Sequence, residues 1–330
     1  MNRRDTVVAL FALGAAGVPF GSLAQQKDRL WRVGMVWGGT KFTVKANEAA
    51  FLAGMKDLGY EVGRNLIVDM RYAGGDPARY PALVDEVITL KPDVLMGTNT
   101  GVAIEMKRRT ATLPIVTGTT ADPVGIGLAQ SLARPGGNVT GMAMQLGELS
   151  AKQIEIMADV LPRMRRVALL FDQSQAKITG NQYEQIAKTA AAAKGLSLDV
   201  HRVAGPEDIR QAFRKLEARR ADALLIGPSP PFNAQRKEIC RSAASIRLPS
   251  IGFSDDWAHD GALMSFGPSF VEANRRTAYF VDRIFKGAKP GDLPIEQPTK
   301  FSLVINATTA KTLGITIPQI VLLRADEVIE

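Results

Sequence analysis

The sequence predicts an α/β protein made of two similar lobes, each a parallel sheet with helices on both faces. Short apolar runs alternate with amphipathic helical segments, which is the pattern of repeated strand–helix–strand units. Several of these runs occur twice along the chain, in the same order. The chain has 330 residues, of which 46% are hydrophobic, so it carries enough apolar side chains for two cores.

The first 24 residues indicate an export leader that is not part of the fold. Arg3 and Arg4 precede an uncharged apolar run over 6–20, and residues 22–24 supply the small side chains that a signal peptidase needs. The run is too short for a membrane-spanning helix with a stop signal. We therefore expect a signal peptide over 1–24. The paired arginines leave twin-arginine export open beside the Sec route, which we favour.

Strands and helices alternate through the first half of the mature chain. Asp76 followed by Pro77 indicates a helix start, because Asp caps free N–H groups and proline fits the first turn. Two glycines within 135–138 allow a sharp reversal, since glycine adopts positive φ readily. Expected strands are 32–37, 66–72, 94–98, 113–117 and 139–144; expected helices are 46–58, a segment after Asp76, 102–109, a short one containing Val124, Leu128 and Leu132, and 150–160.

The second half repeats the first, which implies a second strand–helix–strand unit of the same kind. After it, we expect a long helix over 270–285, an extended Pro/Gly-rich crossing segment over 287–298 and a strand over 301–305. By eye, the matching runs are 166–171 with 32–37, 220–227 with 91–97, 248–252 with 113–117, and 261–266 with 138–143.

Charge and cysteine content exclude several classes of function. The net charge is +8, but the basic residues are scattered over helix surfaces and do not alternate with aromatic residues, so we predict no nucleic-acid binding. Outside the leader, no stretch is long enough to span a bilayer. The single cysteine, Cys240, can form no internal disulfide, and its neighbours Ile239 and Ala243 indicate a buried core position.

Signatures of catalysis are mostly missing from the sequence. Residues 38–41 stand where a dinucleotide-binding glycine motif would follow the first strand, and neither a Walker A sequence nor a Gly-x-Ser-x-Gly elbow is present. The two histidines, His201 and His259, lack a convincing metal-ligand spacing with Asp, Glu or Cys. We therefore expect a protein that is not an enzyme, with no catalytic residues, metal site or cofactor.

The loops that follow the strands are the best candidates for a ligand site, because these loops meet at the carboxyl edge of a parallel sheet. If the two sheets face one another, loops from both halves line one cleft. The candidate ligand-binding residues are Trp37, Gly39, Thr40, Phe42, Thr98, Asn99, Thr100, Thr119 and Asp122 from the first half, and Asp172, Gln173, Ser174, Pro228, Ser229 and Asp255 from the second.

The chemistry of these candidates suits an amino-acid-like zwitterion. Residues 98–100 open a helix, whose free N–H groups and hydroxyls suit a carboxylate. Asp255 or Asp122 could pair with an amino group, and Trp37 or Phe42 could cover an apolar side chain. Structural roles remain open: residues 98–99 as a helix cap, Asp122 as a turn residue before proline, and Trp37 as a core residue.

Three runs resemble one family of proteins. They are DPVGIGLAQSLARPGGNVTG over 122–141, GDPARYPALVDEVITLKPDV over 75–94, and KGAKPGDLPIEQPTKFSLVINATTAKTLGITIP over 286–318. The ending LLRADEVIE is similar to that of the same family. The chain resembles periplasmic substrate-binding proteins of ABC importers, in the group that includes tryptophan- and tyrosine-binding members. The resemblance covers nearly all of the chain after the leader, and it is specific to the family but not to a ligand.

This resemblance implies a type I periplasmic-binding-protein fold, in which two Rossmann-like lobes with parallel sheets are joined by a three-segment hinge. The expected boundaries are 28–145 plus 262–290 for lobe 1, 146–255 plus 300–330 for lobe 2, and 143–148, 255–262 and 290–300 for the hinge crossings.

It further implies a periplasmic, monomeric protein that captures a small ligand between the lobes and delivers it to an ABC permease in the inner membrane. Segments 41–44 and 228–232 differ from commoner members and are expected to set the choice of ligand. Two alternatives remain: a ligand-sensing domain that feeds a membrane receptor, and a secreted α/β enzyme.

Overall fold

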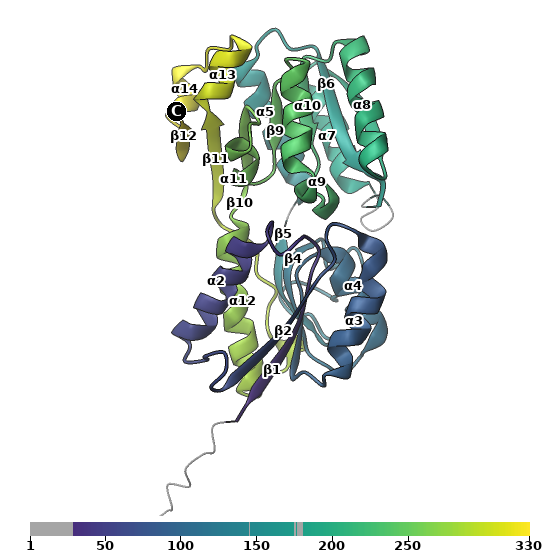
Figure 1. The fold of residues 1–330 in the computed structure, drawn as a ribbon, viewed down its shortest axis with the longest axis vertical. Helices are drawn as coiled ribbons and strands as arrows, with labels where there is room; N and C mark the ends of the chain where they lie inside the picture. The colour runs from purple at the N-terminus through teal and green to yellow at the C-terminus, as the bar shows by residue number, and fades with distance from the viewer. Residues whose placement is uncertain (1–28, 145, 175, 177–180) are drawn as a thin grey trace, which may run out of the picture. The chain divides into compact units, whose positions relative to one another are not determined.

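The computed structural model describes residues 29–330 except 145, 175 and 177–180 (Figure 1). The predicted signal peptide over 1–24 lies outside the described residues. In the described part of the chain, no helix is both long enough and apolar enough to cross a membrane.

Five parallel strands form the first sheet, in the order β2-β1-β3-β4-β5. The strands β1, β3 and β5 are almost fully buried, which explains why the sequence shows continuous apolar runs there. The elements of this lobe are β1 (Trp31–Trp37), α2 (Lys45–Asp57), β2 (Leu66–Tyr72), η1 (Pro77–Arg79), α3 (Tyr80–Thr89), β3 (Val94–Gly97), α4 (Thr100–Arg109), β4 (Ile115–Ala121), β5 (Val139–Met144), α12 (Phe270–Phe285) and η2 (Pro290–Asp292).

Helices cover both faces of this sheet (Figure 1). Neighbouring residues of β1 belong to different core clusters, because side chains alternate across a strand. Met35 packs with residues of α2 and α12 on one face, whereas Val36 packs with residues of α3 and α4 on the other. The predicted start at Asp76 is confirmed, since its carboxylate accepts a hydrogen bond from the Ala78 N–H at 3.0 Å.

Seven strands form the second sheet, in the order β12-β11-β10-β9-β8-β6-β7. Five of its strands are parallel, but β11 runs antiparallel to β10 and β12 is parallel to β11, so the expectation of a wholly parallel sheet is wrong at these two strands. The elements are α5 (Leu146–Val160), β6 (Arg166–Asp172), α7 (Gln182–Ala193), β7 (Ser197–Val203), α8 (Pro206–Arg219), β8 (Ala223–Ile226), α9 (Pro230–Ala234), α10 (Arg236–Ser245), β9 (Ser250–Gly252), α11 (Asp255–His259), β10 (Met264–Pro268), β11 (Phe301–Asn306), α13 (Ala307–Leu313), α14 (Gln319–Leu322) and β12 (Glu327–Ile329).

The strand orders reproduce the internal repeat of the sequence. Strands β7-β6-β8-β9-β10 of the second sheet take the same positions as β2-β1-β3-β4-β5 of the first. Strand β10 is therefore the counterpart of β5, as the match of 261–266 with 138–143 predicts. The two-lobed α/β fold with mainly parallel sheets is confirmed.

The chain passes between the sheets three times, and one predicted crossing has to be corrected. The first passage follows β5. The last passage runs from Glu296, which pairs with Met142 of β5, to the start of β11. The second was expected over 255–262, with 262–290 assigned to lobe 1. However, β10 pairs with β9 and β11, so the passage lies between β10 and α12, and residues up to 268 belong with the second sheet.

The short helix expected through Val124, Leu128 and Leu132 does not form; the segment after β4 is a series of turns. The carboxylate of Asp122 accepts a hydrogen bond from the Gly125 N–H at 2.9 Å, and the Pro123 carbonyl accepts bonds from both Leu128 and Ala129. Gly127 has a φ of 75°, which a continuous helix cannot include. These local bonds compete with the helical ladder, although the apolar spacing is helical.

Candidate functional site

A cavity of about 180 Å³ lies between the carboxyl edges of the two sheets. The first lobe contributes the loops after β1 and β3, Thr119 of β4 and the start of α12. The second lobe contributes the segments after β8 and β9 and the end of β10. The lining residues of the first lobe are Trp37, Gly38, Gly39, Thr43, Val44, Ala46, Asn47, Thr98, Asn99, Thr100, Thr119, Phe270, Val271 and Asn274. Those that follow strands of the second sheet are Pro228, Ser229, Pro230, Asn233, Phe253, Ser254, Asp255, Asp256, Pro268 and Ser269.

Most of the candidate residues lie at this cavity, and the others lie elsewhere. Thr40 bonds to Thr43 within its own turn, and the Phe42 side chain is 75% exposed. Asp122 lies at a separate hollow beside α3 and α4. The candidates at the cavity are Trp37, Gly39, Thr98, Asn99, Thr100, Thr119, Pro228, Ser229 and Asp255; those outside it are Thr40, Phe42, Asp122, Asp172, Gln173 and Ser174.

Asp172 does not line the cavity but forms a hydrogen bond to Ser229, which does. It ends β6 and is 4% exposed. One carboxylate oxygen accepts a hydrogen bond from the Ser174 N–H at 2.8 Å, and the other accepts one from the Ser229 hydroxyl at 2.6 Å. Ser229 in turn caps α9 by accepting a bond from the Phe232 N–H at 3.3 Å. Asp172 therefore holds the α9 segment that borders the cavity.

The hydroxyls around the start of α4 are largely engaged in structural bonds. Thr98 donates to the Val36 carbonyl at 2.9 Å, and Thr119 donates to the Thr98 carbonyl at 2.6 Å. Thr100 accepts a bond from the Ala121 N–H at 2.9 Å. Asn99 caps the helix, because its side-chain oxygen accepts from the Val102 N–H at 3.1 Å. The cap fixes the orientation of this amide.

Four polar atoms of cavity-lining residues are buried and have no hydrogen-bond partner in the described structure. Two are donors, the indole nitrogen of Trp37 and the amide nitrogen of Asn99. Two are acceptors, the amide oxygens of Asn233 and Asn274. Trp37 is 2% exposed and Asn274 1% exposed. Because an unpaired buried polar group is costly, these four atoms are candidates for pairing with a polar ligand.

Sequence reasoning missed Asn233 and Asn274, since both lie within helices and the candidates were sought in loops. Asn274 is on the buried face of α12, next to Ala273 and Ala278. Its amide nitrogen donates to the Phe270 carbonyl at 2.8 Å, which leaves its oxygen unpaired. An asparagine among apolar residues on one helix face was the signal that could have located it.

The charged groups at the cavity are carboxylates. Among the described lining residues, Asp255 and Asp256 are acidic and none is Lys, Arg or His. Burial raises the pKa of Asp255, while a hydrogen bond from Ser302 opposes that rise. Asp256 accepts a bond from Arg236 at 3.4 Å, so part of its charge is compensated. The cavity therefore favours neutral or positively charged groups over anions near α11.

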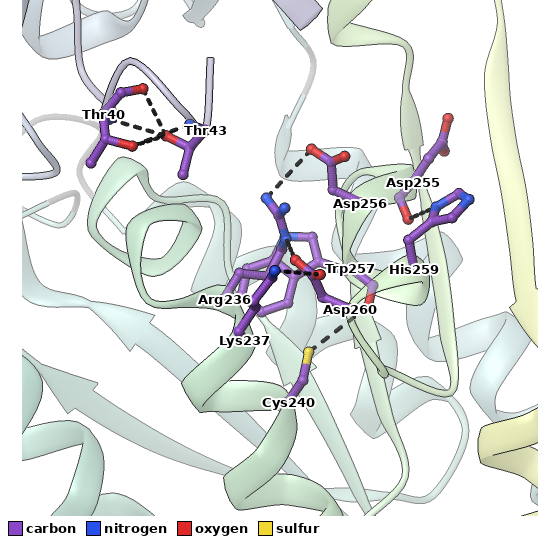
Figure 2. A network of polar contacts seen from close by, with 10 residues as sticks. All are labelled: Thr40, Thr43, Arg236, Lys237, Cys240, Asp255, Asp256, Trp257, His259 and Asp260. Atoms are coloured by element: carbon purple, nitrogen blue, oxygen red, sulfur yellow. Dashed lines mark hydrogen bonds and ion pairs between the residues drawn. The ribbon is translucent and has the colours of Figure 1, made fainter. Parts of the chain in front are cut away.

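A polar network holds α11 against α10 (Figure 2). The Arg236 guanidinium donates to Asp260 at 2.6 Å, and the ammonium of Lys237 lies 4.0 Å from the same carboxylate. Cys240 is buried, as predicted, with its sulfur 3.8 Å from the Trp257 carbonyl oxygen. Burial raises the pKa of the Cys240 thiol to about 12, which keeps it protonated and unreactive near neutral pH.

His259 connects α11 to the C-terminal strand β12. One ring nitrogen lies 3.0 Å from the Asp255 carbonyl, and the other lies 3.0 Å from the Glu327 carboxylate. Burial lowers the pKa of His259, but the hydrogen bond to Asp255 and the negative charge of Glu327 outweigh burial and raise it above its ordinary value of 6.5. Protonated His259 thus stabilises the contact between α11 and β12.

A pH dependence follows from this raised pKa. The contribution of His259 to folding stability should be complete below pH 6.5 and be lost as the pH rises through the higher folded-state pKa. We expect Glu327→Gln to lower the melting temperature at pH 5.5 and to leave it unchanged at pH 9. Differential scanning fluorimetry of both proteins across this range provides the measurement; an equal loss at both pH values would contradict the assignment.

Known proteins share both the sequence pattern and this architecture. A family model described as ABC transporter substrate binding protein matches residues 43–329. A tyrosine-binding protein of Clostridioides difficile is 23% identical over 268 residues, covering 80% of this chain and 75% of that protein. Among solved structures, a conserved domain protein of Vibrio cholerae has a TM-score of 0.84 at 27% identity, covering 91% of this chain and all of that one. An ABC domain of Streptococcus pneumoniae in complex with L-Trp has the same TM-score at 23% identity, covering 91% and 99%.

Proposed function

Because the chain belongs to the family of ABC transporter substrate-binding proteins, we propose that it captures an amino-acid-like ligand between its lobes and delivers it to an inner-membrane ABC permease. The observation that carries this proposal is the set of unpartnered buried donors and acceptors around one cavity. Both kinds of group are needed for a ligand that has a carboxylate and an ammonium group.

The carboxylate is assigned to the first lobe. The free N–H groups at the start of α4 and the amide nitrogen of Asn99 are donors that suit an anion. The side-chain nitrogen of Trp37 provides one further donor. These neutral donors stand in for the arginine that many carboxylate sites use, since no Lys, Arg or His is present among the described lining residues.

The ammonium group is assigned to the acceptors. Asp255 offers a carboxylate, and Asn233 and Asn274 offer unpaired amide oxygens. A charge-assisted hydrogen bond from an ammonium to such oxygens is stronger than a neutral one. The remaining apolar lining, with Val44, Phe253 and Phe270, suits an aliphatic or aromatic side chain.

The names of the relatives agree with this ligand class. One relative is called a tyrosine-binding protein, and one structural neighbour was solved with L-Trp. We therefore extend the proposal to aromatic amino acids as the first ligands to test. The predicted leader would direct the protein to the periplasm, where it would act as a monomer and its ligand-bound form would be recognised by the permease.

A ligand panel tests this proposal. Protein freed of bound compounds by unfolding, dialysis and refolding should show thermal stabilisation with L-tryptophan or L-tyrosine, because a ligand that binds only the folded state stabilises it. L-Glutamate should give no shift, because its second carboxylate would face Asp255 and Asp256. Native mass spectrometry of the untreated protein identifies any compound that co-purifies. Absence of a shift with every amino acid would contradict the ligand class.

A further inference from the structure

The two lobes contact each other beside the cavity through a glycine loop and a short helix. The loop after β2 contains Gly74 and Gly75. The helix is α9, which follows β8 of the second sheet; Figure 1 labels β2 and α9. A Cβ placed on Gly75 would lie 2.7 Å from the Cβ of Ala234 and 3.6 Å from the Pro230 carbonyl oxygen. The backbone of the first lobe therefore lies so close to α9 that only glycine, which has no side chain, fits at position 75.

Both partners in this contact are held rigidly. Gly75 donates its N–H to the Gly38 carbonyl at 2.8 Å, and Gly74 donates to the Gly39 carbonyl at 3.0 Å. These bonds join the contact to Gly38 and Gly39, which line the cavity. On the other side, the Ser229 cap and Asp172 fix the start of α9. A displacement at the contact is therefore transmitted to the cavity walls.

We propose that the contact between Gly75 and Ala234 is a steric stop that sets how far the lobes close, and with it the size of the ligand cavity. Only the expected effect on ligand affinity rests on the proposed function; the limit on lobe closure does not. An added methyl group at Gly75 needs a separation near 3.4–4 Å from its neighbour. The lobes would then meet about 1 Å further apart at this point.

Gly74 provides a matched control, because it shares the backbone strain of Gly75 but not its contact. The φ angles of Gly74 and Gly75 are 73° and 86°, so alanine is strained at both positions. A Cβ on Gly74 would meet only the end of the Arg79 side chain, at 3.5 Å. A difference between Gly74→Ala and Gly75→Ala therefore reports the contact with α9 rather than backbone strain.

The second lobe offers a rescue. Ala234 is the one neighbour closer than 3.6 Å to a Cβ on Gly75, so Ala234→Gly creates the room that Gly75→Ala consumes. We expect Gly75→Ala to reduce the population of the closed form about tenfold. Gly74→Ala should leave that population unchanged, and the double variant Gly75→Ala/Ala234→Gly should restore it.

Pulsed electron paramagnetic resonance measures the closed population without a known ligand. Spin labels at Lys56→Cys on α2 and Glu217→Cys on α8 lie one on each lobe, at exposed positions. The native Cys240 is buried and protonated, so it does not compete for the label. Distances are recorded with and without L-tryptophan in wild type, both single variants and the double variant.

The outcomes separate this inference from the proposed function. Loss of the short label distance in Gly75→Ala alone, with recovery in the double variant, supports the steric stop. Equal short-distance populations in Gly75→Ala and wild type, or no such population in wild type, would overturn it. Failure of L-tryptophan to bind any variant counts against the ligand class, while the ligand-free distances still decide the stop.

Discussion

Replacing Asn274 with leucine should weaken ligand binding at least tenfold while leaving the melting temperature unchanged or slightly raised. Asn274 is 1% exposed and its amide oxygen has no partner in the described structure. Leucine of similar size removes an unpaired buried acceptor, and this gain offsets the loss of the amide's hydrogen bond to the Phe270 carbonyl in the ligand-free protein. The same change deletes the ligand contact that we propose for Asn274, and loss of one such bond reduces affinity by about tenfold or more.

Asn138 is the matched control, because it is a buried asparagine whose hydrogen bonds are all made. Its amide nitrogen donates to the carbonyls of Thr110 and Leu113, and its oxygen accepts from Lys107 at 2.6 Å. Asn138→Leu should therefore destabilise the protein by about 2–4 kcal/mol and leave the affinity of the folded protein unchanged. Isothermal titration with L-tryptophan and denaturant unfolding measure both quantities.

The two variants together distinguish a ligand contact from a structural asparagine. The expected pattern is reciprocal, since Asn274→Leu changes affinity and Asn138→Leu changes stability. If Asn274→Leu lowered stability as much as Asn138→Leu and left binding intact, Asn274 would have a packing role, and the ligand would have to satisfy other groups.

The location of the site was predictable from the sequence because it follows from topology. A repeat in the sequence gives two sheets that share the order of five parallel strands, and parallel strands present their following loops at one edge. This rule placed Trp37, Asn99, Ser229 and Asp255 at one cavity. The rule requires only that the strands and their order along the chain be recognised, and the apolar runs of the sequence mark both.

The roles of individual side chains were not predictable, because they depend on direction and on partners distant in sequence. Asp172 ends one strand of the second sheet and Asp255 follows another, yet Asp172 bonds to the buried Ser229, while Asp255 borders the cavity. Asn274 reaches the cavity only because α12 returns to the first lobe after β10. The position of a residue in the sequence therefore predicts whether it lies near the site. Only the folded structure shows which groups its side chain contacts.

The support that Asp172 gives to α9 predicts a large combined effect on stability and binding. Asp172→Ala removes the acceptor of the Ser229 hydroxyl and of the Ser174 N–H, both in buried or half-buried positions. Hydrogen bonds to a charged group contribute about 1.5–3 kcal/mol, so we expect a loss of about 2–4 kcal/mol in the free energy of unfolding. Affinity for L-tryptophan should also fall, because α9 carries Asn233.

A double-mutant cycle with Ser229 tests whether the effect passes through α9. Asp172→Ala and Ser229→Ala each leave the other partner unpaired and buried, whereas the double variant removes both groups. The loss of stability in the double variant should therefore be smaller than the sum of the single losses by about 1 kcal/mol or more. Additive losses would show that Asp172 acts on the fold independently of α9, and its effect on ligand affinity would then need another route to the cavity.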